Sequence, residues 1–212
     1  MLGVFGGTFD PIHLGHLRTG LEVRDALSMR EVRFIPSRVP PHRKAPQAAA
    51  EQRLAMVAEA LSGETSLQCD DRGMRRDGPS YTVDTLAALR GELNSESLGL
   101  IVGADAFEGI ATWHQWARLV ELAHLVVVHR PGWETRIPSA ALDLLGDRVC
   151  TNRDEVALTP AGRVWFQPVT PLQISASAIR ATVREGGSIR FLVPAVVERY
   201  IRDHRLYLDP EI

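Results

Sequence analysis

The chain has 212 residues, of which 45% are apolar and 24% charged, and this composition is typical of a globular protein. Its formal net charge of −2 gives no basic field for nucleic acid, and no apolar run approaches the ~18 residues that a membrane-spanning helix needs. Cys69 and Cys150 lie far apart and form no CxxC pattern, so neither a disulfide framework nor a zinc site is expected. A reducing, cytoplasmic setting is the default for such a chain.

Apolar runs alternate with helical patterns along the chain. Short apolar runs predict strands at 2–5, 32–35, 66–69, 98–102, 125–129 and 164–168. Apolar residues at helical spacing predict helices at 15–29, 52–61, 82–93, 113–122, 178–184 and 194–204. Between 131 and 160, where Gly, Pro, Asp and Asn are frequent, no core element can be predicted.

Continuous apolar strands between helices are typical of a parallel sheet that is covered on both faces. We therefore expect an α/β fold, a Rossmann-like doubly wound parallel sheet with its ligand site at the C-terminal ends of the strands. The last helices should form a small C-terminal helical cap over roughly 170–212. The whole chain, 1–212, is expected to be a single domain.

The segment 5–16 carries the first functional pattern. Two adjacent glycines end an apolar strand and let the backbone approach a ligand closely, a turn follows at Asp10-Pro11, and His13 and His16 open a helical pattern. Free N–H groups and the dipole at a helix start favour an anion, and two imidazoles on one face add donors or cations where a polyphosphate would lie. The alternative explanations are a structural turn with two surface histidines, or a metal-binding pair.

The stretch from Gly6 to His16 resembles the opening signature of the nucleotidyltransferases with an HxGH motif, and its strand–turn–helix context is the one the motif requires. Those α/β enzymes move a nucleotidyl group from a nucleoside triphosphate onto a phosphate. Their two histidines hold the triphosphate and stabilise the transition state, so the resemblance implies that His13 and His16 are catalytic and bind ATP. It also implies ATP contacts for Gly6, Gly7, Thr8 and Phe9. Because the motif follows so soon after Met1, no signal peptide is expected.

A second pattern lies at 174–180. Ser175 and Ser177 are good N-cap residues, and Arg180, about one turn into the helix, can bind a phosphate with two N–H groups. Taken alone, the pattern indicates a plain N-capped helix with a surface arginine. It also resembles the family motif I-S-x-S-x-I-R, which grips the β- and γ-phosphates. The resemblance implies that Ile174, Ser175 and Ser177 bind ATP, and that Arg180 is both ATP-binding and catalytic.

A third, basic element is the loop Pro40-Pro41-His42-Arg43-Lys44, which follows the second predicted strand. Its prolines stiffen a run of positive side chains that could reach the triphosphate or the acceptor phosphate. In the resembling family one basic residue after Pro-Pro-His does this, and either Arg43 or Lys44 could be that residue here. A solvated basic loop is the alternative.

The nucleoside part of ATP is expected near Gly103 and Asp105, directly after the strand 98–102. A glycine at the end of a strand allows close approach, and a carboxylate there suits a ribose hydroxyl. In the family this Gly-x-Asp lies next to the nucleotide, so both residues are expected to bind ATP. An aspartate that merely caps the next helix is the alternative reading.

Residues 79–82 and 112–116 resemble segments of the bacterial nicotinate mononucleotide adenylyltransferases, in which an aromatic residue stacks on the pyridine ring. A flat heteroaromatic ring favours a stacking partner, and a carboxylate favours N–H or O–H donors. The resemblance implies that Thr82 receives the nicotinate carboxylate, that Trp113 stacks on the ring and that His114 donates its backbone N–H.

Trp116 is the second stacking candidate, because it lies three residues after Trp113. Both tryptophans could instead be an aromatic helix start buried in the core. Arg130, in the His-Arg-Pro-Gly run that closes the strand 125–129, matches the same subfamily and is expected to contact a substrate phosphate.

The resemblance implies the reaction of ATP with nicotinate mononucleotide to give nicotinate adenine dinucleotide and pyrophosphate, in NAD biosynthesis. No protein metal cage is visible, so Mg²⁺ is expected to be held mainly through the ATP phosphates. The expected partners are ATP and nicotinate mononucleotide, with no nucleic acid and no membrane, and a homo-oligomer is possible.

Three alternatives remain open. The first is another nucleotidyltransferase, such as a phosphopantetheine or glycerol-phosphate enzyme. The second is an enzyme that prefers nicotinamide mononucleotide or uses both acceptors. The third is a non-catalytic nucleotide sensor.

Overall fold

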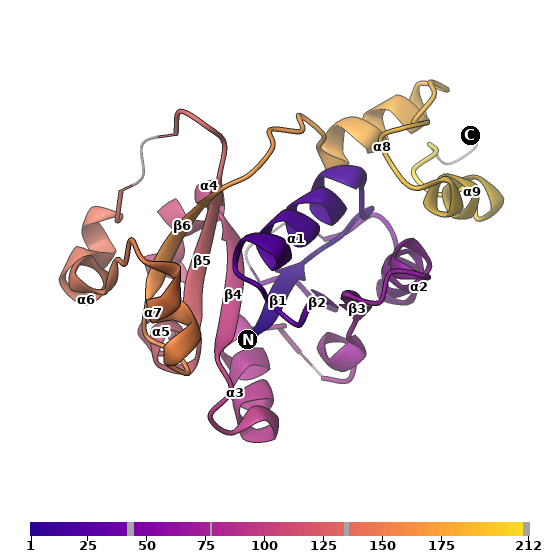
Figure 1. Cartoon of the computed structure of the whole chain (residues 1–212). Helices are drawn as coiled ribbons and strands as arrows, with labels where there is room; N and C mark the ends of the chain where they lie inside the picture. Colours follow the sequence, from indigo (N-terminus) through magenta and orange to yellow (C-terminus); the bar gives the residue numbers. More distant parts are fainter. Residues whose placement is uncertain (42–44, 77, 134–135, 210–212) are drawn as a thin grey trace.

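The computed structural model describes residues 1–41, 45–76, 78–133 and 136–209. Within these residues, six parallel strands form one sheet in the order β3-β2-β1-β4-β5-β6 (Figure 1). The strands are β1 (Leu2–Gly7), β2 (Glu31–Pro36), β3 (Leu67–Cys69), β4 (Leu98–Gly103), β5 (His124–His129) and β6 (Val164–Pro168). Each lies where the sequence predicts it, and the doubly wound, Rossmann-like fold is confirmed.

Helices follow the strands in chain order. The α-helices are α1 (Leu14–Ala26), α2 (Ala50–Leu61), α3 (Thr82–Leu93), α4 (Ala104–Glu108), α5 (Leu119–Leu122), α6 (Leu142–Leu145), α7 (Arg153–Leu158), α8 (Ala176–Arg184) and α9 (Ala195–Asp203). Short 3₁₀ turns are η1 (Asp71–Gly73), η2 (Ile110–Thr112), η3 (Trp116–Arg118), η4 (Ser139–Ala141) and η5 (Gly146–Arg148). No helix in the described part of the chain is long and apolar enough to span a membrane.

Both faces of the sheet are buried, because successive side chains of each central strand point to opposite faces. Val126 and Val128 of β5 join one apolar cluster, which includes residues of α1, α2 and α9. Leu125 and Val127 join the other, which includes residues of α3, α4 and α5. Figure 1 shows the two helical layers on either side of the strands.

The C-terminal helices α8 and α9 form the predicted helical cap (Figure 1). Ile179 of α8 and Ile201 of α9 belong to the same buried cluster as α1 and α2, so the cap shares its core with the sheet. The backbone N–H of Leu14 donates to the carbonyl of Leu192, 2.9 Å away, which fixes the start of α1 against the segment between α8 and α9.

Two expectations need correction. The helix expected at 113–122 is replaced by the 3₁₀ turn η3 from Trp116 and by α5 from Leu119, because Trp113 is extended and Gln115 has a left-handed backbone with φ 49°. The region 131–160 contains core after all: Leu145 of α6 and Val156 of α7 are buried. These helices have four and six residues, too few for a hydrophobic period to be visible in the sequence.

The strand order positions the ligand site. From β1 the chain winds outward to β2 and β3 and then returns to β4 on the other side of β1. In such sheets ligands bind outside the carboxyl ends of the strands, where the winding direction reverses. This reversal lies between β1 and β4, so the loops after Gly7 and after Gly103 face each other across it.

Candidate active site

The loop between β1 and α1 has a constrained backbone. Phe9 has φ 48°, a left-handed conformation that few non-glycine residues adopt. Its ring packs over Gly7, where an added Cβ would lie 2.8 Å from the ring. A Cβ at Gly6 would meet nothing within 4 Å, so the space above that residue is open. The two glycines therefore differ: Gly7 makes room for Phe9, and Gly6 leaves room for a ligand.

The two motif histidines stack on each other at the start of α1. Their ring centroids are 3.7 Å apart, and the backbone N–H of His13 donates to Nδ1 of His16 over 3.3 Å. Because that Nδ1 accepts, the proton of a neutral His16 ring is on Nε2, which makes Nε2–H a donor. A Cβ at Gly15 would lie 3.1 Å from the His13 ring, so the glycine between the histidines lets that ring lie against the helix.

His13 is a neutral side chain in this structure. Burial lowers its pKa to about 4, and the side chain is only 6% exposed. Its buried Nδ1 has no hydrogen-bond partner among the described residues. The sequence leaves open whether the histidines act as donors or as cations, and for His13 the burial favours neutral hydrogen bonding before an anion binds.

The second motif lies directly against the first. Ser175 caps α8 by accepting from the backbone N–H of Ala178 over 3.2 Å. Arg180 donates from Nη1 to the carbonyl of Asp10 over 2.6 Å and from Nη2 to Oγ of Ser177 over 3.3 Å. Segments 170 residues apart are thereby joined, as two motifs that share one phosphate ligand require.

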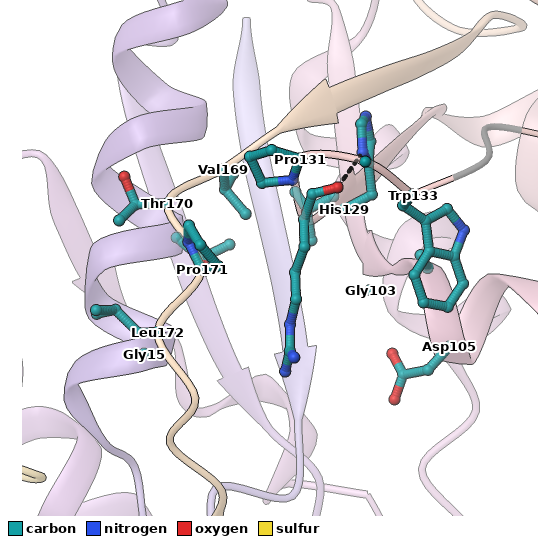
Figure 2. A pocket seen from close by; sticks show the side chains of 15 residues that line it. Gly15, Gly103, Asp105, His129, Pro131, Trp133, Val169, Thr170, Pro171 and Leu172 are labelled. Carbon is teal, nitrogen blue, oxygen red and sulfur yellow. Dashed lines mark hydrogen bonds between the residues drawn. The ribbon is translucent and has the colours of Figure 1, made fainter.

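A cavity of about 610 Å³ opens beside these motifs (Figure 2). Its walls come from four loops and helix starts at the C-terminal edge of the sheet: Gly15 and Thr19; 103–105; 128–133; and 169–172. A cavity of this size at this edge fits a nucleotide.

Two predicted ATP-binding residues line this cavity. A Cβ at Gly103 would lie 2.7 Å from Oδ1 of Asp105, so the glycine makes room for that carboxylate. The N-cap of α4 is Gly103, and Asp105 lies inside the helix, which argues against the capping alternative. Arg130, which was expected to contact a substrate phosphate, lines the same cavity as Gly103 and Asp105.

Trp133 was not predicted as a site residue; it is 42% exposed and lines the cavity above Asp105 (Figure 2). The segment 170–172 on the opposite wall was not predicted either. The available signal was position, because both follow a strand at its carboxyl end, and the tryptophan comes directly after the His-Arg-Pro-Gly run.

The two acceptor segments meet through a ring stack. Tyr81, the N-cap of α3, stacks on His114 with ring centroids 4.2 Å apart, and Thr82 is the first residue of that helix. Trp113 and Trp116 are half-buried and pack on the same apolar cluster as Tyr81. The structure therefore brings the two predicted acceptor segments together, and both tryptophans retain exposed surface.

The loop after β2 is hydrogen-bonded to Ser80, in the first of the two acceptor segments. The backbone N–H groups of Arg38 and Val39 donate to Oγ of Ser80 over 3.0 and 3.3 Å, and the N–H of Ser80 donates to the carbonyl of Val39 over 2.9 Å. The basic loop thus starts beside Thr82, but Arg43 and Lys44 lie outside the described residues.

Arg53 is a buried cation that the sequence reasoning also missed. Its side chain is 1% exposed and donates to the carbonyls of Thr8, Ser37, Arg38 and Ala48. It thereby holds the loops after β1 and β2 together. The helical period was the available signal, because Arg53 precedes the buried Val57 by four residues.

Among residues 1–41, 45–76, 78–133 and 136–209, no three His, Cys, Asp or Glu side chains lie together as a metal cluster.

Comparisons with known proteins show the family to which the chain belongs. Residues 4–182 match the cytidylyltransferase-like family. Over its whole length the chain is 46% identical to a protein of Halorhodospira halophila, and over 99% of its length it is 45% identical to one of Pseudomonas aeruginosa; 97% and 98% of those proteins are covered. Both carry the name probable nicotinate-nucleotide adenylyltransferase.

Solved structures share the fold. A nicotinic acid mononucleotide adenylyltransferase of Plasmodium falciparum, solved with NaAD, has a TM-score of 0.72 at 16% identity, over 97% of this chain and 96% of that one. A putative nicotinate-nucleotide adenylyltransferase of Vibrio parahaemolyticus has a TM-score of 0.65 at 15% identity, over 99% and 96% of the two chains.

Proposed function

We infer the function of this chain from the family to which it belongs: it is a member of the nicotinate-nucleotide adenylyltransferases, within the cytidylyltransferase-like enzymes. It is an enzyme that transfers the adenylyl group of ATP to nicotinate mononucleotide, giving nicotinate adenine dinucleotide and pyrophosphate, in NAD biosynthesis. At the site, this assignment rests on the contact between the two distant phosphate motifs, in which Arg180 donates to the carbonyl of Asp10.

In the proposed mechanism, an oxygen of the acceptor phosphate attacks the α-phosphorus of ATP in line. The new O–P bond forms as the bond to the bridging oxygen breaks, and the electron pair leaves with pyrophosphate. No protein nucleophile is needed, so catalysis comes from positioning and from stabilising the charge on the phosphates.

The proposed catalytic groups are those that converge at the start of α1. His16 offers Nε2–H, His13 a neutral ring, and Arg180 a guanidinium held by Asp10 and Ser177. Ser175 and Ser177 would add donors at the start of α8. Mg²⁺, carried by the ATP phosphates, would supply further positive charge.

We assign the adenosine part of ATP to the 610 Å³ cavity. Asp105 would accept from a ribose hydroxyl, and Gly103 would permit close approach of the nucleotide. Trp133 and Arg130 offer a ring and a guanidinium against which a purine could lie. The open space above Gly6 would let the phosphates pass toward the histidines.

The acceptor is proposed to bind across the start of α3. Thr82 and the backbone of His114 would receive the nicotinate carboxylate, and Trp113 or Trp116 would stack on the pyridine ring. Arg43 and Lys44 stay candidates for the acceptor phosphate. We also propose that the enzyme works in the cytoplasm, which fits its two free cysteines; a homo-oligomer remains a proposal that sizing in solution would test.

The test is pyrophosphate release from ATP and Mg²⁺ with three acceptors in parallel: nicotinate mononucleotide, nicotinamide mononucleotide and phosphopantetheine. Fast release with the first alone supports the reaction and the carboxylate pocket at Thr82. Release with nicotinamide mononucleotide as well would show that the donors of the pocket also pair with the amide group of that acceptor. Release only with phosphopantetheine would overturn the acceptor assignment, and no release would favour a nucleotide sensor.

A further inference from the structure

A buried carboxylate links the first phosphate motif to the end of the chain. The side chain of Asp10 is 7% exposed and accepts three hydrogen bonds. The backbone N–H of Gln47 donates to Oδ2 over 2.8 Å, that of Ala48 to Oδ1 over 3.1 Å, and the hydroxyl of Tyr207 to Oδ1 over 2.9 Å. The Tyr207 bond spans 197 positions of sequence and comes from beyond the last helix.

Tyr207 is well suited to be a permanent donor. Burial and the adjacent Asp10 carboxylate raise the pKa of its phenol well above the ordinary value, so the hydroxyl keeps its proton at every pH at which the protein works. Its backbone has φ 65°, an unfavourable conformation for a residue with a side chain. Such a conformation persists only where surrounding contacts hold it, and the phenol is buried against Asp10.

The same aspartate holds the catalytic arginine. Nη1 of Arg180 donates to the Asp10 carbonyl over 2.6 Å and lies 3.7 Å from Oδ2 of its carboxylate. Nε of Arg180 is buried and makes no hydrogen bond to any residue that the structure describes. The guanidinium is thus held by Asp10 and by Oγ of Ser177, and Tyr207 is the one side chain among the three hydrogen-bond donors to the Asp10 carboxylate that the structure describes.

The charges in this cluster also require the aspartate to stay in place. Arg53 is fully buried behind the loop, and Asp10 is the largest source of compensating negative charge near it. Tyr207 stabilises the ionised carboxylate without adding charge, because it donates as a neutral hydroxyl. Asp10 can thereby compensate the positive charge of Arg53 and still orient the guanidinium of Arg180.

We propose that Tyr207 is a positioning residue for adenylyl transfer: it fixes Asp10, and Asp10 fixes Arg180 for the triphosphate. The inference rests on the proposed function, because Arg180 needs a triphosphate on which to act. Tyr207 touches no substrate in this scheme and acts only through the two residues between it and the reaction.

The test begins with Tyr207→Phe, which removes one hydroxyl and keeps the ring. We expect kcat to fall roughly ten-fold, since a hydrogen bond to a charged group is lost. KM for nicotinate mononucleotide should change less than two-fold, since the acceptor segments do not touch this network. The matched control is Tyr200→Phe in α9, whose ring stacks on His204 with centroids 3.9 Å apart, and it should keep wild-type kinetics. An unchanged kcat for Tyr207→Phe, whatever its melting temperature, would overturn the proposal.

A double-mutant cycle separates positioning from mere stabilisation of the fold. If Tyr207 acts through Arg180, adding Tyr207→Phe to Arg180→Ala should lower kcat by less than two-fold further. If the tyrosine only supports the fold, the loss should be the same ten-fold with and without the arginine, and the proposal fails.

Failure of the proposed function would look different. If the wild-type protein releases no pyrophosphate with nicotinate mononucleotide, the acceptor assignment fails, and the cycle is then run on the dissociation constant for ATP. Coupling of Tyr207 and Arg180 in ATP affinity would still support the positioning role, and additive losses would overturn it.

Discussion

The two ends of the site are built differently. The phosphate end, comprising residues 6–16 and 175–180, consists of buried or backbone-bonded groups: stacked imidazoles, a carboxylate with three donors and an arginine bound to a carbonyl. The acceptor end, comprising residues 79–82 and 112–116, consists of the half-buried Trp113 and Trp116 and of the stack of Tyr81 on the exposed His114. The proposed functional side chains are thus held by hydrogen bonds at the phosphate end and by ring stacking and apolar packing at the acceptor end.

The difference follows from what each end is proposed to hold. Charge stabilisation at phosphates depends on donors that do not reorganise during the reaction, and buried hydrogen-bonded groups provide this. Recognition of a flat ring depends on contact area, which aromatic side chains supply with few torsions. Substitutions at the phosphate end should therefore lower kcat, and those at the acceptor end should raise the acceptor's KM.

The largest effect is expected for His16→Ala. Removing the Nε2–H donor should lower kcat by roughly a thousand-fold, in the range known for the loss of one transition-state donor. The melting temperature should fall only modestly, because His16 is partly buried and the change removes its stack on His13 and one hydrogen bond at the start of α1. Steady-state pyrophosphate release measures kcat, and His204→Ala, at the C-cap of α9, is the control. Near wild-type turnover of the His16→Ala variant would contradict a catalytic role for His16 at the phosphate end.

The next effect concerns stability and pH. The unfolded chain protonates His13 near its ordinary pKa of 6.5, whereas the folded protein does so only near 4. Between these values the unfolded state binds more protons, so the free energy of unfolding should fall as the pH falls, by about 2 kcal/mol between pH 7 and 5. Burial also lowers the pKa of His124, so this residue adds a further loss of stability as the pH falls.

Urea unfolding at pH 7 and pH 5 measures this change, with His13→Gln as the comparison. The variant should lose less stability on acidification than the wild type, because the contribution of His13 is removed and those of the other groups, His124 among them, are unchanged. Equal pH dependence in the two proteins would show that His13 is not held neutral by burial.

A smaller effect distinguishes the two tryptophans of the acceptor end. If Trp113 stacks on the pyridine ring, Trp113→Ala should raise KM for nicotinate mononucleotide about ten-fold, the usual scale for loss of a base–aromatic stack. Trp116→Ala should then raise it much less, and both variants should keep KM for ATP. The reverse order would assign the stack to Trp116, and a rise in KM for ATP alone would contradict the proposed division of the site.

The sequence predicted strands and long helices well, and predicted residues with a left-handed backbone poorly. Six strands and the helix of 82–93 show clear periods, and the structure has them. The start of 113–122 was wrong because the left-handed Gln115 leaves no trace in hydrophobic spacing. Motifs indicated His13, His16 and Arg180 as candidates, but not the burial that keeps His13 neutral. The burial of Arg53 was not predicted, because a charged residue is normally expected on the exposed face of a helix. Only the folded structure shows the four carbonyl groups that accept its hydrogen bonds.

The bond between Asp10 and Tyr207 also has a consequence for the order in which the molecule is made. A ribosome delivers the β1–α1 loop among the first residues and the tyrosine about 200 residues later. Until residue 207 emerges, the Asp10 carboxylate lacks its phenol donor and the loop that carries both histidines is incompletely fixed. The nascent protein therefore completes its phosphate end only after residue 207 has been translated, 197 residues after Asp10.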